Sequence, residues 1–369
     1  MKKDSSSMPH AYSLYLDMVR FLAAVAVFLD HISSYPFTKN VFWYRLGSYG
    51  GVAVMIFFVL SGYVIAYVTS TRERFAFQYA SARIARIYSV VLVALLITLL
   101  FDSIGAALNP AFYSIQKILW KPESVEGYIS SLFFVNEYQI FHFNGIAPGS
   151  NGPYWSLSFE VTYYLVAGLF LFARRWIALP LIMILMVLAG RTVAALLPIW
   201  VLGYILYFVR LNNISKSLLY AGFTVSTILL VLTPVLADRL PQNNFGLYFP
   251  WGRGPFNRNL IEDYLSAFFF ALNVVCAREI LRDVGFLAGG RIESLIRWLG
   301  SLTFPLYLIH FPALALFSSI SPWSNESVGN VLFIGLLTFA LVIFVAPFCD
   351  RLKNAMKNGM QMVSRLKTV

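Results

Sequence analysis

The chain has 369 residues, of which 59% are hydrophobic and 12% charged, whereas an ordinary soluble domain carries about 25% charged residues. This composition, with a mean hydropathy of +0.71, excludes a water-soluble globular fold and indicates that the bilayer is the solvent. The formal net charge of +11 does not point to nucleic acid, because the basic residues gather in the connections on one side of the apolar segments.

Ten apolar blocks, mostly of about 17 to 22 residues, follow one another along the chain, close to the length of a helix that crosses a bilayer. We therefore predict an all-α, polytopic transmembrane helix bundle of about ten helices. It forms a single domain over residues 1–369, with cytoplasmic tails at 1–13 and 350–369. The predicted spans are 14–34, 50–69, 87–104, 155–172, 176–190, 192–209, 217–236, 260–277, 299–320 and 330–348.

The basic residues predict the orientation of the chain. An even number of spans puts both termini on one side of the membrane, and most of the 28 Lys and Arg residues fall on that side. Cytoplasmic loops carry the excess of Lys and Arg in membrane proteins. Both termini are therefore expected in the cytoplasm.

The first span carries four ionisable residues, Asp17, Arg20, Asp30 and His31, although a charge at the bilayer centre costs about 2.5 to 3.5 kcal/mol. Asp17 precedes Arg20 by three residues, which predicts an ion pair. Arg20 and His31 share a helix face and lie about 16 Å apart along its axis. That spacing suits a long substrate with an anionic part near Arg20 and a reactive carbon near His31, whose imidazole can take a proton from a hydroxyl group. A hydrated helix end without chemistry is an equal alternative for His31.

The second and third spans add a packing motif and two cations. In the run VMIFFVLSGYVIAY, Ser61 can hydrogen-bond across a helix pair, Gly62 permits close approach, and Tyr63 follows them. Arg83 and Arg86 lie one helical turn apart in the next cytoplasmic loop, where two guanidinium groups can clamp phosphate groups. Packing alone explains the first motif equally well, and the cytoplasmic excess of cations explains the second.

Two outer connections are long enough to carry function. Residues 105–154 are expected to include a re-entrant or interfacial piece. The loop 238–259 holds Tyr248, Trp251 and Arg253, whose rings and cation can stack on sugar faces. An interfacial aromatic belt is the alternative for this loop.

Two later motifs bring more polar side chains into the membrane. The run NGPYWSLSFEVTYY opens the span 155–172 and places Glu160 where a carboxylate can orient an imidazole or bind a substrate hydroxyl. Ser156 and Ser158 also suit helix capping. The run RWLGSLTFPLYLIHFP holds Tyr307 and, one turn later, His310, for which a satisfied core histidine is the alternative.

Taken in this order, the motifs resemble those of the acyltransferase 3 family of bacterial membrane enzymes. The shared features are an Arg followed after ten residues by His, the Phe-Phe-x-Leu-Ser-Gly helix, the Arg-x-x-Arg pair, the Trp-Ser-Leu-Ser-x-Glu motif and a late helix with Tyr-x-x-His. The resemblance covers the whole chain. It implies a multi-pass protein of the inner membrane that transfers an acyl group, above all acetyl, from cytoplasmic acyl-CoA to a hydroxyl of a surface glycan, exopolysaccharide or lipid-linked sugar.

The resemblance also implies roles for individual residues. His31 and Glu160 are the expected catalytic residues, and Arg20, Arg83 and Arg86 are expected to bind the acetyl-CoA donor. Membrane lipid, acyl-CoA and a glycan acceptor are the expected partners, with no metal and no nucleic acid. Residues expected to contact substrate or support the site are Asp17, Asp30, Ser61, Tyr63, Trp155, Ser156, Ser158, Tyr164, Tyr307 and His310.

Several alternatives stay open at this point. His31 can act as a general base or form a transient acyl-imidazole. A transporter or flippase for a polysaccharide intermediate also needs buried charges. A different class of membrane acyltransferase would centre its chemistry on His310. The sequence does not identify the acceptor sugar, the acyl chain or the oligomeric state.

Overall fold

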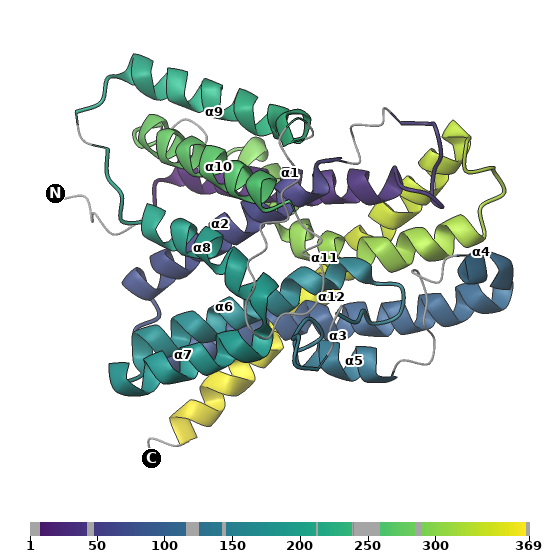
Figure 1. The fold of residues 1–369 in the computed structure, drawn as a ribbon, viewed down its shortest axis with the longest axis horizontal. Coiled ribbons are helices and arrows are strands. Elements are labelled where there is room, and N and C mark those ends of the chain that lie inside the picture. The colour runs from purple at the N-terminus through teal and green to yellow at the C-terminus, as the bar shows by residue number, and fades with distance from the viewer. Residues whose placement is uncertain are drawn as a thin grey trace. The chain divides into compact units, whose positions relative to one another are not determined.

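A computed structural model describes residues 8–42, 48–115, 125–141, 145–211, 213–237, 239, 259–284 and 289–366. This part of the chain contains helices and no strand (Figure 1), so the predicted all-α fold is confirmed. The helices are α1 (His10–Ile32), α2 (Gly50–Thr71), α3 (Ala76–Leu108), α4 (Pro110–Ile115), α5 (Val125–Leu132), the 3-10 helix η2 (Gly152–Tyr154), α6 (Trp155–Phe172), α7 (Arg175–Ala189), α8 (Arg191–Leu206), α9 (Lys216–Ala237), α10 (Leu260–Ile280), α11 (Arg291–Ser319) and α12 (Val328–Leu366).

Eight helical stretches among the described residues are long and apolar enough to cross a membrane. They are α1, α2, α3, η2 with α6, and α9 to α12. The apolar helices α7 and α8 have 15 and 16 residues, about 22 to 24 Å, which is shorter than a hydrocarbon core of about 30 Å. Because eight and ten are both even, the predicted location of both termini on one side does not depend on α7 and α8.

Two helices extend beyond the predicted spans. The third predicted span, 87–104, belongs to a helix that begins at Ala76, because no Gly or Pro interrupts the chain before Gly105. Arg83 and Arg86 therefore lie on α3 and not in the predicted loop. The tail predicted from residue 350 is likewise helical, since α12 continues to Leu366.

The helices form two compact units, each built from three separate stretches of chain. The first unit contains residues up to Val27, Ser48–Arg74 and Arg191–Thr303. The second contains Phe28–Gly47, Phe75–Gly190 and the residues from Phe304 onward. Helices α1 and α11 contribute to both units. The single domain expected over the whole chain stays a prediction.

Two glycines set the close packing of α2 on α8 in the first unit. A Cβ atom on Gly62 would lie 2.0 Å from the carbonyl oxygen of Trp200, and one on Gly203 would lie 2.0 Å from that of Val59. Small residues let membrane helices approach in this way. The indole nitrogen of Trp200 also donates a hydrogen bond to the Ser61 hydroxyl at 3.1 Å. The packing roles predicted for Ser61 and Gly62 are confirmed.

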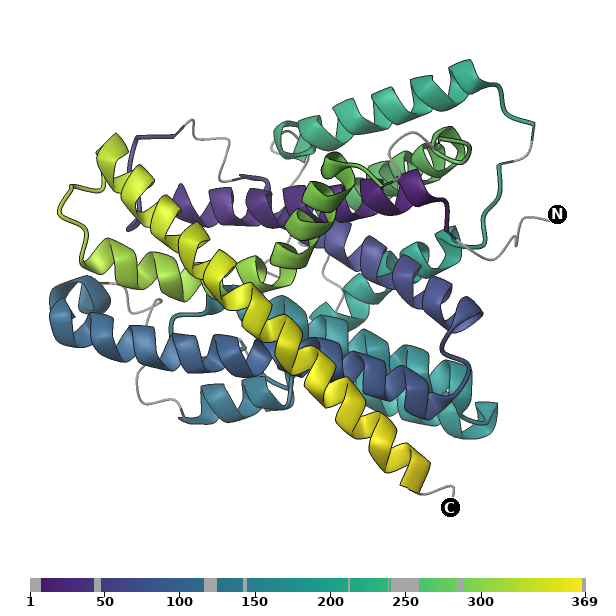
Figure 2. The ribbon, with the colours of Figure 1, turned by 180° about the vertical axis from the view of Figure 1, so that it is seen from behind.

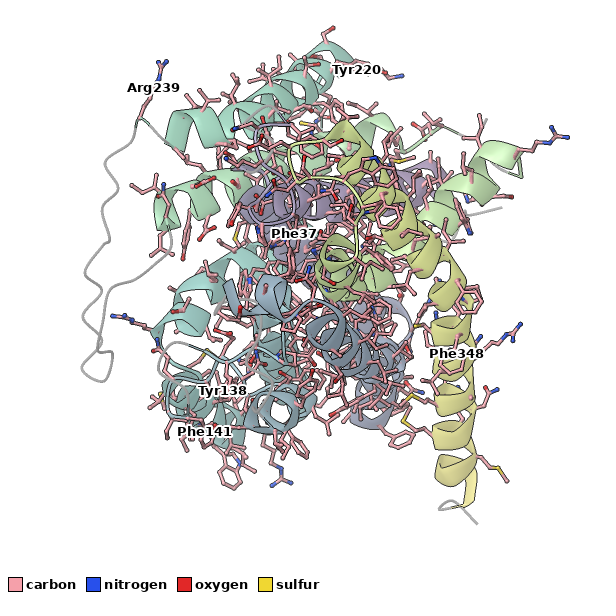
Figure 3. All side chains as sticks on the ribbon, turned by 90° about the vertical axis from the view of Figure 1, so that its right-hand side faces the viewer. Phe37, Tyr138, Phe141, Tyr220, Arg239 and Phe348 are labelled. Carbon is pink, nitrogen blue, oxygen red and sulfur yellow. The ribbon has the colours of Figure 1, made fainter. Side chains whose placement is uncertain are left out.

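In the second unit α12 packs along α3, and α7 packs beside α6. Figure 2 shows α12 in yellow crossing α3 in blue. Helix α12 exposes Phe344 and Phe348, at 82% and 58%, and Figure 3 shows Phe348 pointing outward. A helix that exposes large apolar side chains suits contact with lipid.

The long connection between α3 and α6 folds back against these helices. The carbonyl oxygen of Leu132 accepts a hydrogen bond from the hydroxyl of Tyr88, in the middle third of α3, at 3.0 Å. The hydroxyl of Tyr138 lies 2.8 Å from that of Thr162 on α6. Backbone at membrane depth must find such partners within the protein. The placement of residues 125–141 supports the re-entrant alternative for this connection.

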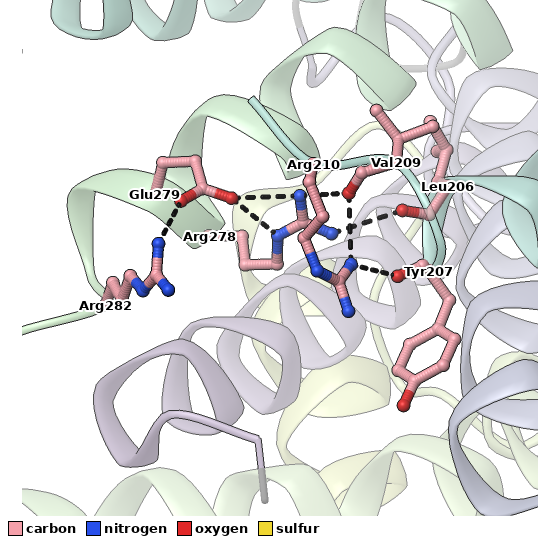
Figure 4. Close-up of polar contacts among 7 residues, drawn as sticks. All are labelled: Leu206, Tyr207, Val209, Arg210, Arg278, Glu279 and Arg282. Carbon is pink, nitrogen blue, oxygen red and sulfur yellow. Dashed lines mark hydrogen bonds and ion pairs between the residues drawn. The ribbon is translucent and has the colours of Figure 1, made fainter. Parts of the chain in front are cut away.

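The end of α10 is joined to the end of α8 by a buried arginine (Figure 4). The guanidinium of Arg278 donates hydrogen bonds to the carbonyl oxygens of Leu206, at 3.2 Å, and of Val209, and it pairs with Glu279 at 3.0 Å. The last carbonyl groups of a helix have no partner within it. Arg278 therefore stabilises a helix end, in addition to its part in the charge asymmetry.

The glycine contacts predict how α2 responds to a single methyl group. We expect Gly62→Ala to destabilise the protein by about 1 to 3 kcal/mol or more, because the methyl group would overlap backbone of α8. Gly51→Ala on the same helix is the control, since nothing lies within 4 Å of its added Cβ. Thermal unfolding of the two purified variants in detergent is the measurement. Equal melting temperatures would contradict the packing.

Candidate active site

Two histidines that are far apart in the sequence meet in the second unit. His31 lies half-buried in the last turn of α1, and His310 is fully buried on α11. The Nε2 atom of His310 lies 3.1 Å from Nδ1 of His31, and the two ring centres are 5.1 Å apart. The structure thus brings together the expected catalytic histidine and a histidine expected only to support it.

A backbone carbonyl determines which nitrogen atoms of this pair carry protons. Nδ1 of His310 lies 2.9 Å from the carbonyl oxygen of Leu306, which can only accept, so this nitrogen is protonated. In a neutral imidazole the other nitrogen is then an acceptor, and His31 must donate to it from Nδ1. The lone pair of a neutral His31 is therefore on Nε2, where the ring can take a proton from a substrate hydroxyl.

Aromatic rings surround the pair and hold its orientation. Phe311 meets the His31 ring edge-on with centres 5.2 Å apart. Phe28 meets the His310 ring edge-on at 6.3 Å and is itself packed against Phe339 at 5.1 Å. Edge-to-face contacts of this kind favour one ring orientation. The imidazoles are thus positioned on one side by hydrogen bonds and on the other by packing.

The start of α6 is bound to α11 one turn before His310. The hydroxyl groups of Ser156 and Tyr307 lie 2.6 Å apart, and Tyr307 also donates to the carbonyl oxygen of Pro153 at 3.2 Å. The ring of Tyr307 lies 6.3 Å from that of His310. Two residues of the Trp-Ser-Leu-Ser and Tyr-x-x-His motifs are therefore in direct contact.

The capping role considered for Ser156 and Ser158 is wrong. The residue before α6, Tyr154, makes no side-chain cap. Ser158 instead donates a hydrogen bond to the carbonyl oxygen of Phe134 at 2.5 Å, and Ser156 is engaged with Tyr307. Partners from other parts of the fold have replaced the local backbone groups that a capping serine would use.

A proline accounts for a residue that sequence reasoning missed. Pro312 has no N–H group, so the carbonyl oxygen of Leu308 loses its partner within α11. The buried side chain of Asn151 donates to that oxygen at 2.8 Å. Asp102 on α3, also buried, holds the same loop by accepting from the Ser150 N–H at 2.7 Å. An acid inside a predicted span was an available signal for Asp102.

Glu160 belongs to a second group of polar side chains, farther along α6. It accepts a hydrogen bond from Tyr164, and the guanidinium of Arg83 stacks on the rings of Tyr164 and Tyr79 at 5.7 and 5.3 Å. Such stacking favours a partly desolvated cation. Arg86 lies half-buried one turn after Arg83.

A cavity of about 450 Å³ opens beside this second group, between α3 and α6. Arg83 and the tyrosines Tyr79, Tyr88 and Tyr164 form part of its wall, and the rest is apolar. Trp155, another residue expected at the site, is not among the residues that line this cavity and packs edge-on against Phe159 with ring centres 5.1 Å apart. The cavity offers an apolar chain a place next to a cation.

The remaining expected residues lie in the first unit or directly before His31. Arg20 pairs with Asp17 at 3.7 Å, which confirms the predicted ion pair, and Asp17 also binds Arg297 of α11. Tyr63 contacts other tyrosines edge-on. Asp30, next to His31, accepts hydrogen bonds at its backbone carbonyl. Among the described residues, no group of three or more His, Cys, Asp or Glu side chains is placed to hold a metal ion.

Known proteins with a similar sequence point to one chemistry. The model of a family described as an acyltransferase domain matches residues 13–349. The chain is similar to Acyltransferase MdmB of Streptomyces mycarofaciens, with 29% identity over 162 residues, which are 40% of this chain and 36% of that relative. The matched stretch thus covers little more than a third of the relative's length. No solved structure matches the chain.

The hydrogen bonds of the pair predict a specific tautomer of His31. We expect neutral His31 to carry its proton on Nδ1 and its lone pair on Nε2, because Leu306 orients His310. The measurement is ¹⁵N NMR of the protein with ¹⁵N-labelled histidine. The chain has 4 histidines, so few signals need assignment. His31→Ala and His310→Ala samples assign the signals. A neutral His31 protonated on Nε2 would contradict the hydrogen-bond order.

Proposed function

The chain belongs to the acyltransferase-domain family, whose model matches its residues 13–349, and on that premise we propose that it carries an acetyl group from cytoplasmic acetyl-CoA to a hydroxyl of a surface glycan, exopolysaccharide or lipid-linked sugar. The contact between His31 and His310 carries the proposal, since it supplies an oriented base within an acyltransferase fold. The proposed location is the inner membrane. The long apolar helices support a protein that meets its donor on one side and its acceptor on the other.

The proposed reaction uses Nε2 of His31 as the base. It takes the proton of the acceptor hydroxyl while the hydroxyl oxygen attacks the thioester carbonyl carbon. The carbon–sulfur bond then breaks, and the coenzyme A thiolate takes the proton back from the imidazolium. The positive charge that develops on His31 is stabilised by His310, whose Nε2 accepts the Nδ1–H bond. A transient acyl-imidazole on His31 is the alternative route.

The donor is proposed to approach along the second polar group. Arg83 and Arg86 bind the phosphate groups of coenzyme A, and Arg20 lines the path of the pantetheine arm. The apolar cavity beside Arg83 supports this assignment because the donor carries both an anionic and a less polar part. Glu160, held by Tyr164, is proposed to position the reacting groups from this side.

A transporter or flippase would use buried charges without breaking a thioester. The family membership and the oriented imidazole pair favour the enzyme. Release of coenzyme A thiol by the purified protein separates the two functions, because a transporter releases none. An acceptor-independent hydrolysis of the thioester would also count for the enzyme.

Histidine variants test the proposed chemistry. We expect His31→Ala to lower transfer of radiolabelled acetyl from acetyl-CoA to membrane glycan by about 10² to 10⁴-fold, the usual effect of losing a general base. His310→Ala should lower kcat with little change in KM, because it orients His31. The control is His10→Ala, which removes a histidine paired with Glu293 at the protein surface. With membrane abundance matched, undiminished transfer by His31→Ala would overturn the proposal.

Arginine variants test the donor site separately. We expect Arg83→Gln and Arg86→Gln to raise the KM for acetyl-CoA roughly 10 to 100-fold, since a hydrogen bond to a charged group contributes about 1.5 to 3 kcal/mol. Arg282→Gln removes the same charge from a side chain that is 65% exposed and is the matched control. Initial-rate kinetics of coenzyme A release give the KM. A KM equal to that of the control in both variants would contradict a phosphate site.

A further inference from the structure

A small pocket lies in the second unit between the loop after α1 and the loop that joins α11 to α12. Its volume is about 190 Å³, below the roughly 300 to 1,000 Å³ of sites that enclose a drug-sized ligand. We propose that it binds one uncharged sugar ring of the acceptor, on the same glycan as the ring that receives the acyl group. The identity of the ligand as acceptor rests on the proposed function, whereas the binding of a sugar does not.

Aromatic side chains form the walls of this pocket. Phe37 is fully buried. Tyr35 and Trp323 also line the pocket, yet they stay 58% and 48% exposed. The indole of Trp323 is held against Phe333 with ring centres 5.5 Å apart. The electron-rich face of such rings attracts the C–H groups on the flat side of a pyranose.

Polar atoms on the same walls are available for sugar hydroxyl groups. Asn330 and Asn325 use their amide nitrogens to donate to the backbone oxygens of Phe37, at 2.8 Å, and Pro36, at 3.4 Å. These bonds leave the amide oxygens as acceptors. The buried hydroxyl oxygen of Ser318 has no hydrogen-bond partner among the described residues, although buried polar groups are normally paired. A ligand hydroxyl would supply the missing partner.

The pocket is held in shape before any ligand binds. The Lys39 N–H donates to the carbonyl oxygen of Asn325 at 2.9 Å, and the Lys39 ammonium pairs with Glu326 at 2.9 Å. The hydrogen bond that the Lys39 ammonium donates to the Glu326 carboxylate raises the pKa of Lys39 above its usual value. These contacts join the two loops, which lowers the entropic cost of ordering them when a ligand binds.

The charge of the pocket favours a neutral ligand. None of the residues that line it is charged, and the ion pair of Lys39 with Glu326 in the same two loops has no net charge. A phosphate or carboxylate group would find no cation in the wall. Aromatic faces with amide and hydroxyl groups suit an uncharged sugar instead.

Two aromatic rings, Phe37 in the pocket wall and Phe311 behind it, link the pocket to the imidazole pair. Phe311 contacts the ring of His31 at 5.2 Å and that of Phe37 at 5.3 Å, and Phe37 lines the pocket. A sugar ring in the pocket is therefore too far from His31 to be acylated itself, and another ring of the same glycan would have to reach the base. The loops involved follow the first and ninth predicted spans, which places them on the outer side in the predicted topology.

The other sugar-stacking loop considered from sequence, with Trp251 and Arg253, lies outside the described residues.

Saturation-transfer NMR tests the pocket without relying on catalysis. The full chain in lipid nanodiscs, free of glycoside detergent, is mixed with the methyl glycosides of glucose, galactose, mannose, rhamnose and N-acetylglucosamine. We expect saturation of the ring protons of at least one glycoside. Trp323→Ala should weaken its binding roughly tenfold, a change of about 1.4 kcal/mol. Trp176→Ala, which removes a tryptophan 71% exposed on α7, is the matched control.

Further variants keep the outcome clear. Ser318→Ala and Trp323→Phe should weaken binding less than Trp323→Ala, and they serve if the latter fails to fold. His31→Ala should bind the glycoside like the wild type while failing in transfer. Undiminished transfer by this variant would therefore sink the proposed function and leave the pocket proposal standing. The pocket proposal is overturned if no glycoside is saturated above empty nanodiscs, or if Trp323 and Trp176 variants bind equally.

Discussion

The hydrogen bond between Nδ1 of His310 and the Leu306 carbonyl oxygen is the constraint on which the site depends. A neutral imidazole is both donor and acceptor, and either nitrogen can carry the proton unless a hydrogen-bonding neighbour favours one tautomer. Here a helix carbonyl fixes the tautomer of His310, and His310 in turn fixes the tautomer of His31. Because the deciding group is backbone, the order of protons in the pair is built into α11 and does not require a buried carboxylate, which would be costly at membrane depth.

Local patterns predicted the elements well and the partners poorly. Helix α6 was predicted at 155–172 and has those bounds, and the Asp17–Arg20 pair follows from helix spacing alone. His31 and His310 are 279 residues apart, so no periodicity links them. Ser156 was expected to cap a helix because capping is a local rule, yet Tyr307 of another helix is its partner. Contacts of this kind depend on tertiary packing, which one sequence without relatives does not reveal.

Helix α6 connects the two polar groups of the second unit. Ser156 contacts α11 beside the imidazole pair, and Tyr164 contacts Arg83 eight residues later, about 12 Å along the axis. A donor whose phosphates lie beside Arg83 must therefore extend along α6 to bring its thioester to His31. The extended pantetheine arm of coenzyme A meets that requirement, whereas a compact donor would not. The separation of the two groups therefore matches the proposed donor, whose anionic end and reacting end are far apart.

The proposed sugar pocket behind Phe311 would allow the site to select its acceptor. Water is the competing nucleophile wherever an imidazole base meets a thioester, and it needs no binding site. In the proposed reaction, a glycan held by one ring in the pocket presents a hydroxyl group of another ring to Nε2 of His31, so that binding energy from a ring that does not react positions the ring that does. Phe311 contacts both the base and the wall of the pocket, and therefore sets the distance between them. On this proposal, acceptor specificity depends on the spacing between the bound sugar ring and the reacting one, and not on contacts at the reacting hydroxyl alone.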